Sequence, residues 1–166
     1  MDDFESAPLV GWTNGLLDST AISVFTSFLG RYGSSLSPEK LYTGIPTNAP
    51  ILKLEFDFYE IDSWDTESFF VVINCFMIPL GTFRSTTDEG RRQGLVVDVQ
   101  FETQSLGPPF NGGFGVQSEQ IHHVTVYLHT RFINGLLKLE FGSNTNESVN
   151  NESYGIDNIK ISAIQC

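Results

Sequence analysis

Apolar and polar residues alternate in short bursts along most of the chain, and no helical period persists for more than about two turns. Such alternation is typical of strands that bury one face. In the clearest segment, residues 52–62, Leu52, Leu54, Phe56 and Phe58 share one face. The same pattern predicts further inward-facing sets within residues 95–101, 124–128, 137–141 and 159–161.

One segment departs from simple alternation, because residues 68–76 are apolar at both odd and even positions. This pattern predicts either a central strand that is covered on both faces or a strand that crosses from the core to an interface. Cys75 belongs to this apolar run, and we expect it to be a buried free thiol.

Polar loops rich in Gly and Pro separate about seven or eight such strands. We therefore predict an all-β fold, a jelly-roll β-sandwich of two antiparallel sheets. The whole chain, residues 1–166, is predicted to form a single β-sandwich domain, a module or subunit of a larger extracellular protein or assembly.

Four carboxylates lie within eight residues at the end of the clearest strand and just beyond it: Glu60, Asp62, Asp65 and Glu67. Glu60 and Asp62 continue the face of Phe56 and Phe58, so they are expected where the core ends. Like charges partly removed from water are costly unless a cation, amide donors or a proton offsets them. A hard cation with oxygen ligands makes calcium the first hypothesis, with Asp62, Asp65 and Glu67 as ligands. Alternatively, the same carboxylates cap turns and face water.

The end of the chain repeats this pattern, because Asp157 has the parity of Ile159 and Ile161 and is expected at the edge of the core. Gly155 admits an unusual backbone angle that would free carbonyl groups to turn toward an ion. Glu5 supplies a carboxylate at the start of the chain. An ion held between the first and last strands would add its binding energy to the stability of the fold.

Several segments together resemble extracellular jelly-roll domains of bacterial and protist surface and adhesion proteins, and more distantly MAM-type and galactose-binding-like modules. These segments are Asp3-Phe4-Glu5, Gly11-Trp12, Phe28-Leu29-Gly30, the strand from Phe56 to Asp65, and the phrase from Glu152 to Ile159. The resemblance to galactose-binding-like modules implies a structural calcium held by an acid near the first strand and an acid in the last strand. These acids correspond to Glu5 and Asp157.

The net charge of −11 argues against a nucleic-acid partner or an anionic membrane surface, because both need a positive patch. It suits cation binding and plain solubility equally. No stretch approaches the roughly 20 apolar residues of a membrane span, so we expect no direct membrane insertion.

The histidines do not indicate a zinc site, because His123 and His129 share a strand face but lie roughly 20 Å apart. No nucleophile elbow, phosphate loop or dinucleotide fingerprint occurs in the sequence, so we expect a non-catalytic protein.

Aromatic side chains are candidates for binding a ligand: Trp64, Tyr59, and Phe110 with Phe114 in a Gly/Pro-rich loop. Trp64 either stacks on a sugar ring or packs over the end of the core.

Asn146-Glu147-Ser148 and Asn151-Glu152-Ser153 are glycosylation acceptor patterns, which favour secretion to the extracellular space or cell surface. Alternatively, this run uses Asn and Ser to make turns.

The sequence thus predicts a calcium-stabilised extracellular recognition or adhesion module whose partner is a glycan or a protein on a surface. The alternative is a structural subunit of a surface filament or assembly that binds protein neighbours or copies of itself.

Overall fold

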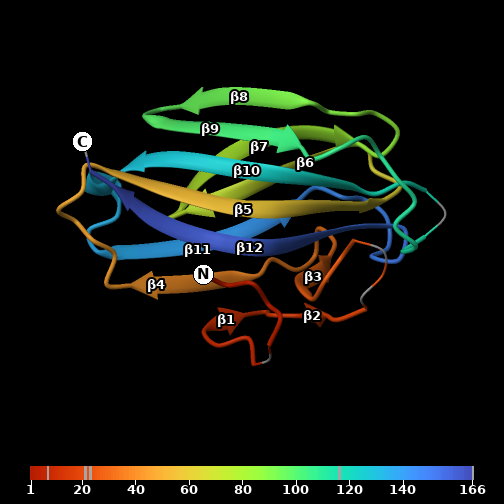
Figure 1. Cartoon of the computed structure of the whole chain (residues 1–166), viewed down its shortest axis with the longest axis horizontal. Coiled ribbons are helices and arrows are strands. Elements are labelled where there is room, and N and C mark those ends of the chain that lie inside the picture. Colours follow the sequence, from red (N-terminus) through yellow and green to blue (C-terminus); the bar gives the residue numbers. More distant parts are fainter. Residues whose placement is uncertain (7, 21, 23, 116, 166) are drawn as a thin grey trace.

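Two antiparallel sheets pack face to face around one core, which confirms the predicted all-β sandwich (Figure 1). The computed structural model describes residues 1–6, 8–20, 22, 24–115 and 117–165. The five-stranded sheet has the order β1 (Trp12–Thr13), β4 (Glu39–Thr43), β11 (Leu136–Ser143), β6 (Asp65–Ile73) and β7 (Phe76–Arg84). The seven-stranded sheet has the order β2 (Leu17–Asp18), β3 (Phe28–Tyr32), β12 (Glu152–Ile164), β5 (Ile51–Asp62), β10 (Gln120–His129), β9 (Val99–Ser105) and β8 (Arg91–Val96).

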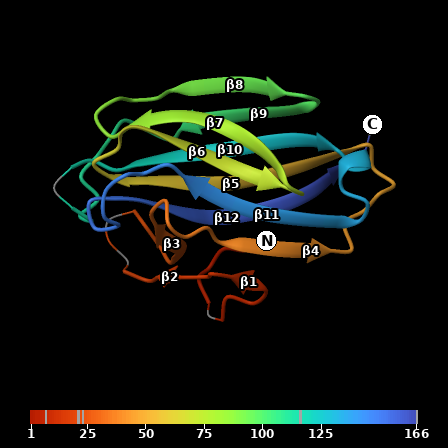
Figure 2. The ribbon, with the colours of Figure 1, turned by 180° about the vertical axis from the view of Figure 1, so that it is seen from behind.

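The chain passes repeatedly from one sheet to the other, as in a jelly roll. β4 and β5, β5 and β6, and β10, β11 and β12 are consecutive in sequence but alternate between the sheets. The 3-10 helix η1 (Thr130–Phe132) lies between β10 and β11. The loops after β5, β7, β9 and β11 therefore gather at one end of the sandwich, which we call the carboxylate end (Figure 2).

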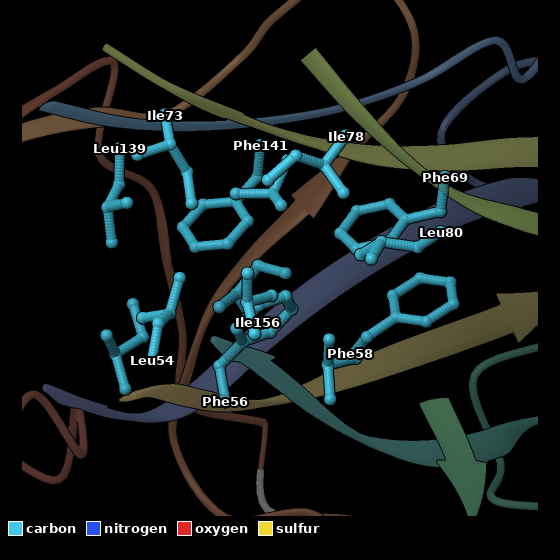
Figure 3. Close-up of a cluster of buried hydrophobic side chains, with 14 of the residues drawn as sticks. Leu54, Phe56, Phe58, Phe69, Ile73, Ile78, Leu80, Leu139, Phe141 and Ile156 are labelled. Atoms are coloured by element: carbon cyan, nitrogen blue, oxygen red, sulfur yellow. The ribbon is translucent and has the colours of Figure 1, made fainter. Parts of the chain in front are cut away.

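The core forms where the inward faces of the two sheets meet (Figure 3). Phe58 of β5 stacks on Phe69 of β6 with ring centroids 4.0 Å apart, and Phe56 packs edge-on against Phe141 of β11 at 5.0 Å. Leu52, Leu54, Phe56 and Phe58 are all buried, so the predicted inward face of residues 52–58 is confirmed. The sets in residues 124–128 and 137–141 are likewise buried, on β10 and β11.

The prediction of one inward-facing strand over residues 95–101 is wrong. β8 ends at Val96 and β9 begins at Val99, so the chain reverses direction within this segment. Val97 adopts a φ of 55°, and Leu95 and Val97 are 71% and 66% exposed. The structure has a hairpin of two short strands here. The alternating pattern runs through the turn, so the sequence resembles that of one continuous strand.

The strand predicted at residues 68–76 also ends earlier, because β6 stops at Ile73 and a turn through Asn74 and Cys75 leads into β7. Both turn residues have positive φ values, 48° and 68°. Cys75 is exposed at this turn, so the expectation of a buried thiol is wrong. Cys166 lies outside the described residues.

A bulge changes the face of the last strand, so Asp157 does not share the inward face of Ile159. Asp157 lies directly opposite Asp57 of β5, and the register shifts between Asp157 and Lys160. Asn158 has a φ of 53° at this shift. An inserted residue reverses the alternation beyond it. Asp157 consequently faces the outer side of the seven-stranded sheet, although it is buried there.

The first residues are joined to the last strand by backbone hydrogen bonds. The N–H of Asp2 donates to the carbonyl of Ile159 over 2.9 Å, and the N–H of Ile159 donates back over 2.9 Å. Phe4 enters the main core beside Trp12. Contact between the two ends of the chain thus needs no ion.

Candidate cation site

Acidic side chains are concentrated at the carboxylate end of the sandwich, and most of them are buried. Glu60 and Asp62 at the end of β5 have almost no exposed surface, as their parity predicted. Glu67, Glu119 and Glu152 are equally buried. Buried carboxylates persist only where hydrogen bonds, protons or cations offset the loss of hydration.

Three of these acids form a cluster that joins the two sheets. Asp65 and Glu67 belong to β6 of the five-stranded sheet, whereas Glu152 begins β12 of the seven-stranded sheet. Each contributes an oxygen within 4.8 Å of the other two. Calcium–oxygen distances of roughly 2.4 Å would let a single ion contact all three oxygens.

A register shift at the start of β6 shapes one side of the carboxylate cluster. The shift lies between Asp65 and Glu67, and Thr66 has a φ of 144°. Oε2 of Glu67 accepts hydrogen bonds from the N–H groups of Asp65 and Thr66, over 2.6 and 3.1 Å. The bulged backbone therefore holds the Glu67 carboxylate in place.

The loop before β12 holds the other side of the cluster in the same way. Oε2 of Glu152 accepts from the N–H groups of Asn146 and Glu147, over 2.6 and 3.2 Å. The side-chain amide of Asn146 donates to Oε1 of Glu67 over 3.4 Å. Glu67 and Glu152 are thus preorganised by backbone donors rather than by long flexible cations.

The three carboxyl groups differ in how tightly they hold a proton. A hydrogen bond with Glu67, followed by repulsion from its charge, raises the pKa of Asp65. Burial by itself would raise the pKa of Glu67, but the hydrogen bonds that its carboxylate accepts from backbone N–H groups lower this pKa. Burial, together with the charge of Glu67, raises the pKa of Glu152. An entering cation would therefore compete with protons on Asp65 and Glu152.

The cluster is accessible from solvent through Asp65, which is exposed. Asp65 lines a polar hollow of about 580 Å³ with Ser63, Arg84, Glu147 and Asn151 among its other walls. Carboxylate, hydroxyl and amide oxygens are ligands that suit hard cations such as calcium. The arrangement can hold a divalent cation at the rim of the hollow.

The predicted ligand set is only partly brought together. Asp65 and Glu67 share the cluster, but Asp62 lies apart from it: its Oδ1 accepts the N–H of Gln117 over 3.0 Å. Asp62 therefore anchors the loop that leads into β10. Sequence reasoning missed Glu152 as a member of the cluster. Its parity with the inward-facing Tyr154 and Ile156 was the available signal.

Of the other predicted pair, Asp157 lies on the outer side of the seven-stranded sheet, and Glu5 is exposed in the segment before β1. Asp157 accepts the hydroxyl of Tyr59 over 2.8 Å and the N–H of Asn158 over 2.7 Å. Burial raises the pKa of Asp157 to about 6, those hydrogen bonds oppose the rise, and the charges of Asp57 and Glu5 add to it. Glu5 is therefore close enough to repel Asp157, and a structural ion here stays a prediction.

Gly155 does not adopt the unusual backbone angle that was expected to turn carbonyl groups toward an ion. It is not among the glycines with positive φ, and a Cβ at this position would lie 2.5 Å from Cε2 of Phe28. Gly155 lets the Phe28 ring pack against the backbone of β12.

The predicted ligand-binding aromatics are largely covered. Trp64 is only 1% exposed, and its Nε1 donates to the carbonyl of Ser153 over 2.8 Å. This favours the core-packing alternative, because a sugar needs an open ring face. Tyr59 is buried too, in a second cluster on the outer side of the seven-stranded sheet. Half-buried Phe110 and Phe114 pack there on Phe25, at 5.7 and 4.9 Å.

A buried acid–base pair was not foreseen from the sequence. Glu60 Oε2 lies 2.9 Å from Nε2 of His122, and the imidazole ring stacks on Phe58 and meets Phe83 edge-on. Within the described residues, Glu60 Oε1 and His122 Nδ1 have no hydrogen-bond partner. His122 shares the parity of Val124, Val126 and Leu128, which was the signal for its burial.

Burial shifts both groups of this pair toward their neutral forms. It raises the pKa of Glu60 to about 8, with Arg92 opposing and Glu67 adding to the rise. It lowers the pKa of His122 to about 3, with Arg92 adding to the fall and Asp88 opposing it.

Asn146 and Asn151, the predicted glycosylation acceptors, are exposed in the loop between β11 and β12. The side-chain amide of Asn151 donates to Glu147. Their modification stays a prediction.

Comparisons with protein-family models, curated proteins and solved structures find no match to this chain. Among the described residues, no helix is both long and apolar enough to cross a membrane.

Proposed function

We propose that this chain is a calcium-stabilised extracellular recognition or adhesion module without catalytic activity. The observation that carries the proposal is the cluster of Asp65, Glu67 and Glu152, whose oxygens converge from both sheets. A cation between them would tie β6 to β12 and offset their mutual repulsion. Extracellular modules bind calcium weakly, at concentrations of about 0.1–1 mM, which suits a partly open site with three carboxylates.

Calcium is expected to raise the melting temperature, because it binds the folded state and the cluster does not exist in the unfolded chain. Differential scanning fluorimetry would compare millimolar calcium, millimolar magnesium and chelator. Glu152→Gln should lose most of the calcium-dependent rise. Glu140→Gln, an acid-to-amide change on β11 away from the cluster, should keep it. An equal melting temperature in calcium and chelator would contradict the proposal.

The ligand in this proposal is a glycan that lies in the polar hollow beside the cluster. The hollow presents the hydroxyl, guanidinium and amide groups of Ser63, Arg84 and Asn151. Such groups satisfy sugar hydroxyls without an open aromatic platform. A glycan array probed in calcium and in chelator would show binding in calcium alone, and a blank array in both conditions would count against a glycan ligand.

A second candidate function is a structural subunit that contacts protein neighbours. It is favoured by exposed apolar side chains at the end opposite the carboxylates, where Phe76, Val97 and Phe132 surround a hollow of about 110 Å³. Light scattering should then show association that Phe76→Ser weakens. Association unchanged in that variant would count against this end as the contact.

A further inference from the structure

The four edges of the two sheets are not equally protected against pairing with another strand. β1 and β2, each at one edge of its sheet, are two residues long. β7, at another edge, contains Pro79 and pairs with β6 through register shifts. Very short strands, proline, bulges and charged side chains are devices by which proteins block edge pairing.

β8 has only the last of these devices, Arg91 and Arg92, and both arginines form ion pairs with acids of the same chain. Its six residues pair with β9 in continuous register and include no proline. Figures 1 and 2 both show β8 at the outer margin of the molecule, with no segment beyond it. Among the described strands, β8 is thus the edge that is best able to accept a partner strand.

The register with β9 determines which backbone groups of β8 are free. The N–H of Ser105 donates to the carbonyl of Gly90 over 2.8 Å. Hydrogen-bonded pairs alternate along an antiparallel ladder, so Arg92, Gly94 and Val96 bond to β9. The backbone N–H and C=O groups of Arg91, Gln93 and Leu95 therefore point away from the sheet.

We propose that β8 pairs antiparallel with β8 of a second copy of this chain, across a two-fold axis at Gln93. The two seven-stranded sheets would then form one continuous sheet. Arg91 would lie opposite Leu95 of the second copy, and Gln93 opposite its own counterpart. This register uses every outward-facing backbone group of both strands, which gives about six hydrogen bonds.

Charge selects this register over its neighbour. Slipping by two residues would place Arg92 directly opposite Arg92 of the second copy, and opposed like charges are destabilising. In the proposed register, Arg92 lies opposite Gly94. The edge also avoids the acidic excess of the molecule, because β8 carries two arginines and no acid. Glu102 and Glu89 pair with these arginines within one copy.

The proposal rests on the second candidate function and deepens it: it names a second copy as the partner and places the contact on β8 in place of the apolar end. It does not depend on the cation. Sedimentation equilibrium in chelator should show a reversible dimer. Gln93→Lys keeps an attractive neighbour in Glu102 within one copy but places two ammonium groups opposite each other. We expect this variant to dimerise about two- to fivefold more weakly. Gln100→Lys makes the same change one strand inward and should dimerise like the wild type.

Cross-linking tests the register directly. Hydrogen-bonded antiparallel pairs have Cα atoms about 5.5 Å apart, which suits a disulfide. In a background with Cys75→Ser and Cys166→Ser, oxidised Gln93→Cys should run as a covalent dimer, whereas Gln100→Cys should stay monomeric.

A wild type that is monomeric at all concentrations would overturn both this proposal and the second candidate function. A dimer that Gln93→Lys leaves intact, or that fails to cross-link through Cys at position 93, would overturn the β8 proposal alone. Weakening by Phe76→Ser would then assign the contact to the apolar end.

Discussion

At the scale of single residues, the Glu60–His122 pair shows how burial sets protonation. The histidine holds its proton only below a pKa of about 3, and the carboxyl group holds its proton up to a pKa of about 8. Between these values the pair carries one proton. The pair would still carry one titratable proton if that proton moved from Glu60 to His122, so the neutral pair and the ion pair hold the same number of protons.

The pair predicts a dome in stability as the pH changes. The pKa of His122 falls from 6.5 to about 3 on folding, so its contribution is present above pH 6.5 and is lost as the pH falls toward 3. The pKa of Glu60 rises from 4.5 to about 8, so its contribution is present below pH 4.5 and is lost as the pH rises toward 8. The two effects cancel between pH 4.5 and 6.5.

Urea unfolding at several pH values checks this. Each limb should slope by at most about 1.4 kcal/mol per pH unit, and Glu60→Gln should remove the alkaline limb. An unchanged alkaline limb in Glu60→Gln would assign that limb to other groups.

At the scale of elements, bulges and turns decide which face each side chain occupies. Asp157 faces outward because of the bulge before Lys160, and Leu95 is exposed because the chain reverses at Val97. Neither feature has a strong local signal, because the positive φ values fall on Asn158 and Val97 rather than on glycine. Glycine at Gly155 serves close packing instead of a turn.

Gly155→Ala should therefore destabilise the fold. Its Cβ would press on the buried rings of Phe28 and Tyr59, which lie 2.5 and 3.3 Å from that position. We expect a loss of about 1–3 kcal/mol in the free energy of unfolding. Gly107→Ala is the matched control, because no atom lies within 4 Å of a Cβ there. Equal stability of the two variants in urea would show that the rings can move aside.

At the scale of the whole molecule, one core holds both sheets while the two ends differ in character. Phe58 contacts Trp64, Phe69 and Phe83 beyond β5, so it links strands of both sheets. The carboxylates gather at one end, and exposed apolar side chains gather at the other. A cation at the first end and a strand partner along β8 would engage separate surfaces.

Phe58→Ala should lower the free energy of unfolding by about 3–5 kcal/mol, because it removes a buried ring that both sheets contact. Phe132→Ala removes the same ring where it is 43% exposed, and should cost much less. Chemical denaturation followed by tryptophan fluorescence would measure both. A small loss in Phe58→Ala would show that the core closes around the cavity.

The sequence by itself determined the sandwich and the burial of its first carboxylates, because strand periodicity is a local property. Leu52 through Phe58 alternate in the sequence as they do in the fold, and Glu60 follows Phe58 inward. Only the tertiary structure decided that Glu152 joins Asp65 and Glu67, that Asp62 does not, and that β8 is left as a free edge. Those outcomes depend on which strands, distant in the sequence, become neighbours in a sheet. The local alternation of apolar and polar residues does not specify that pairing.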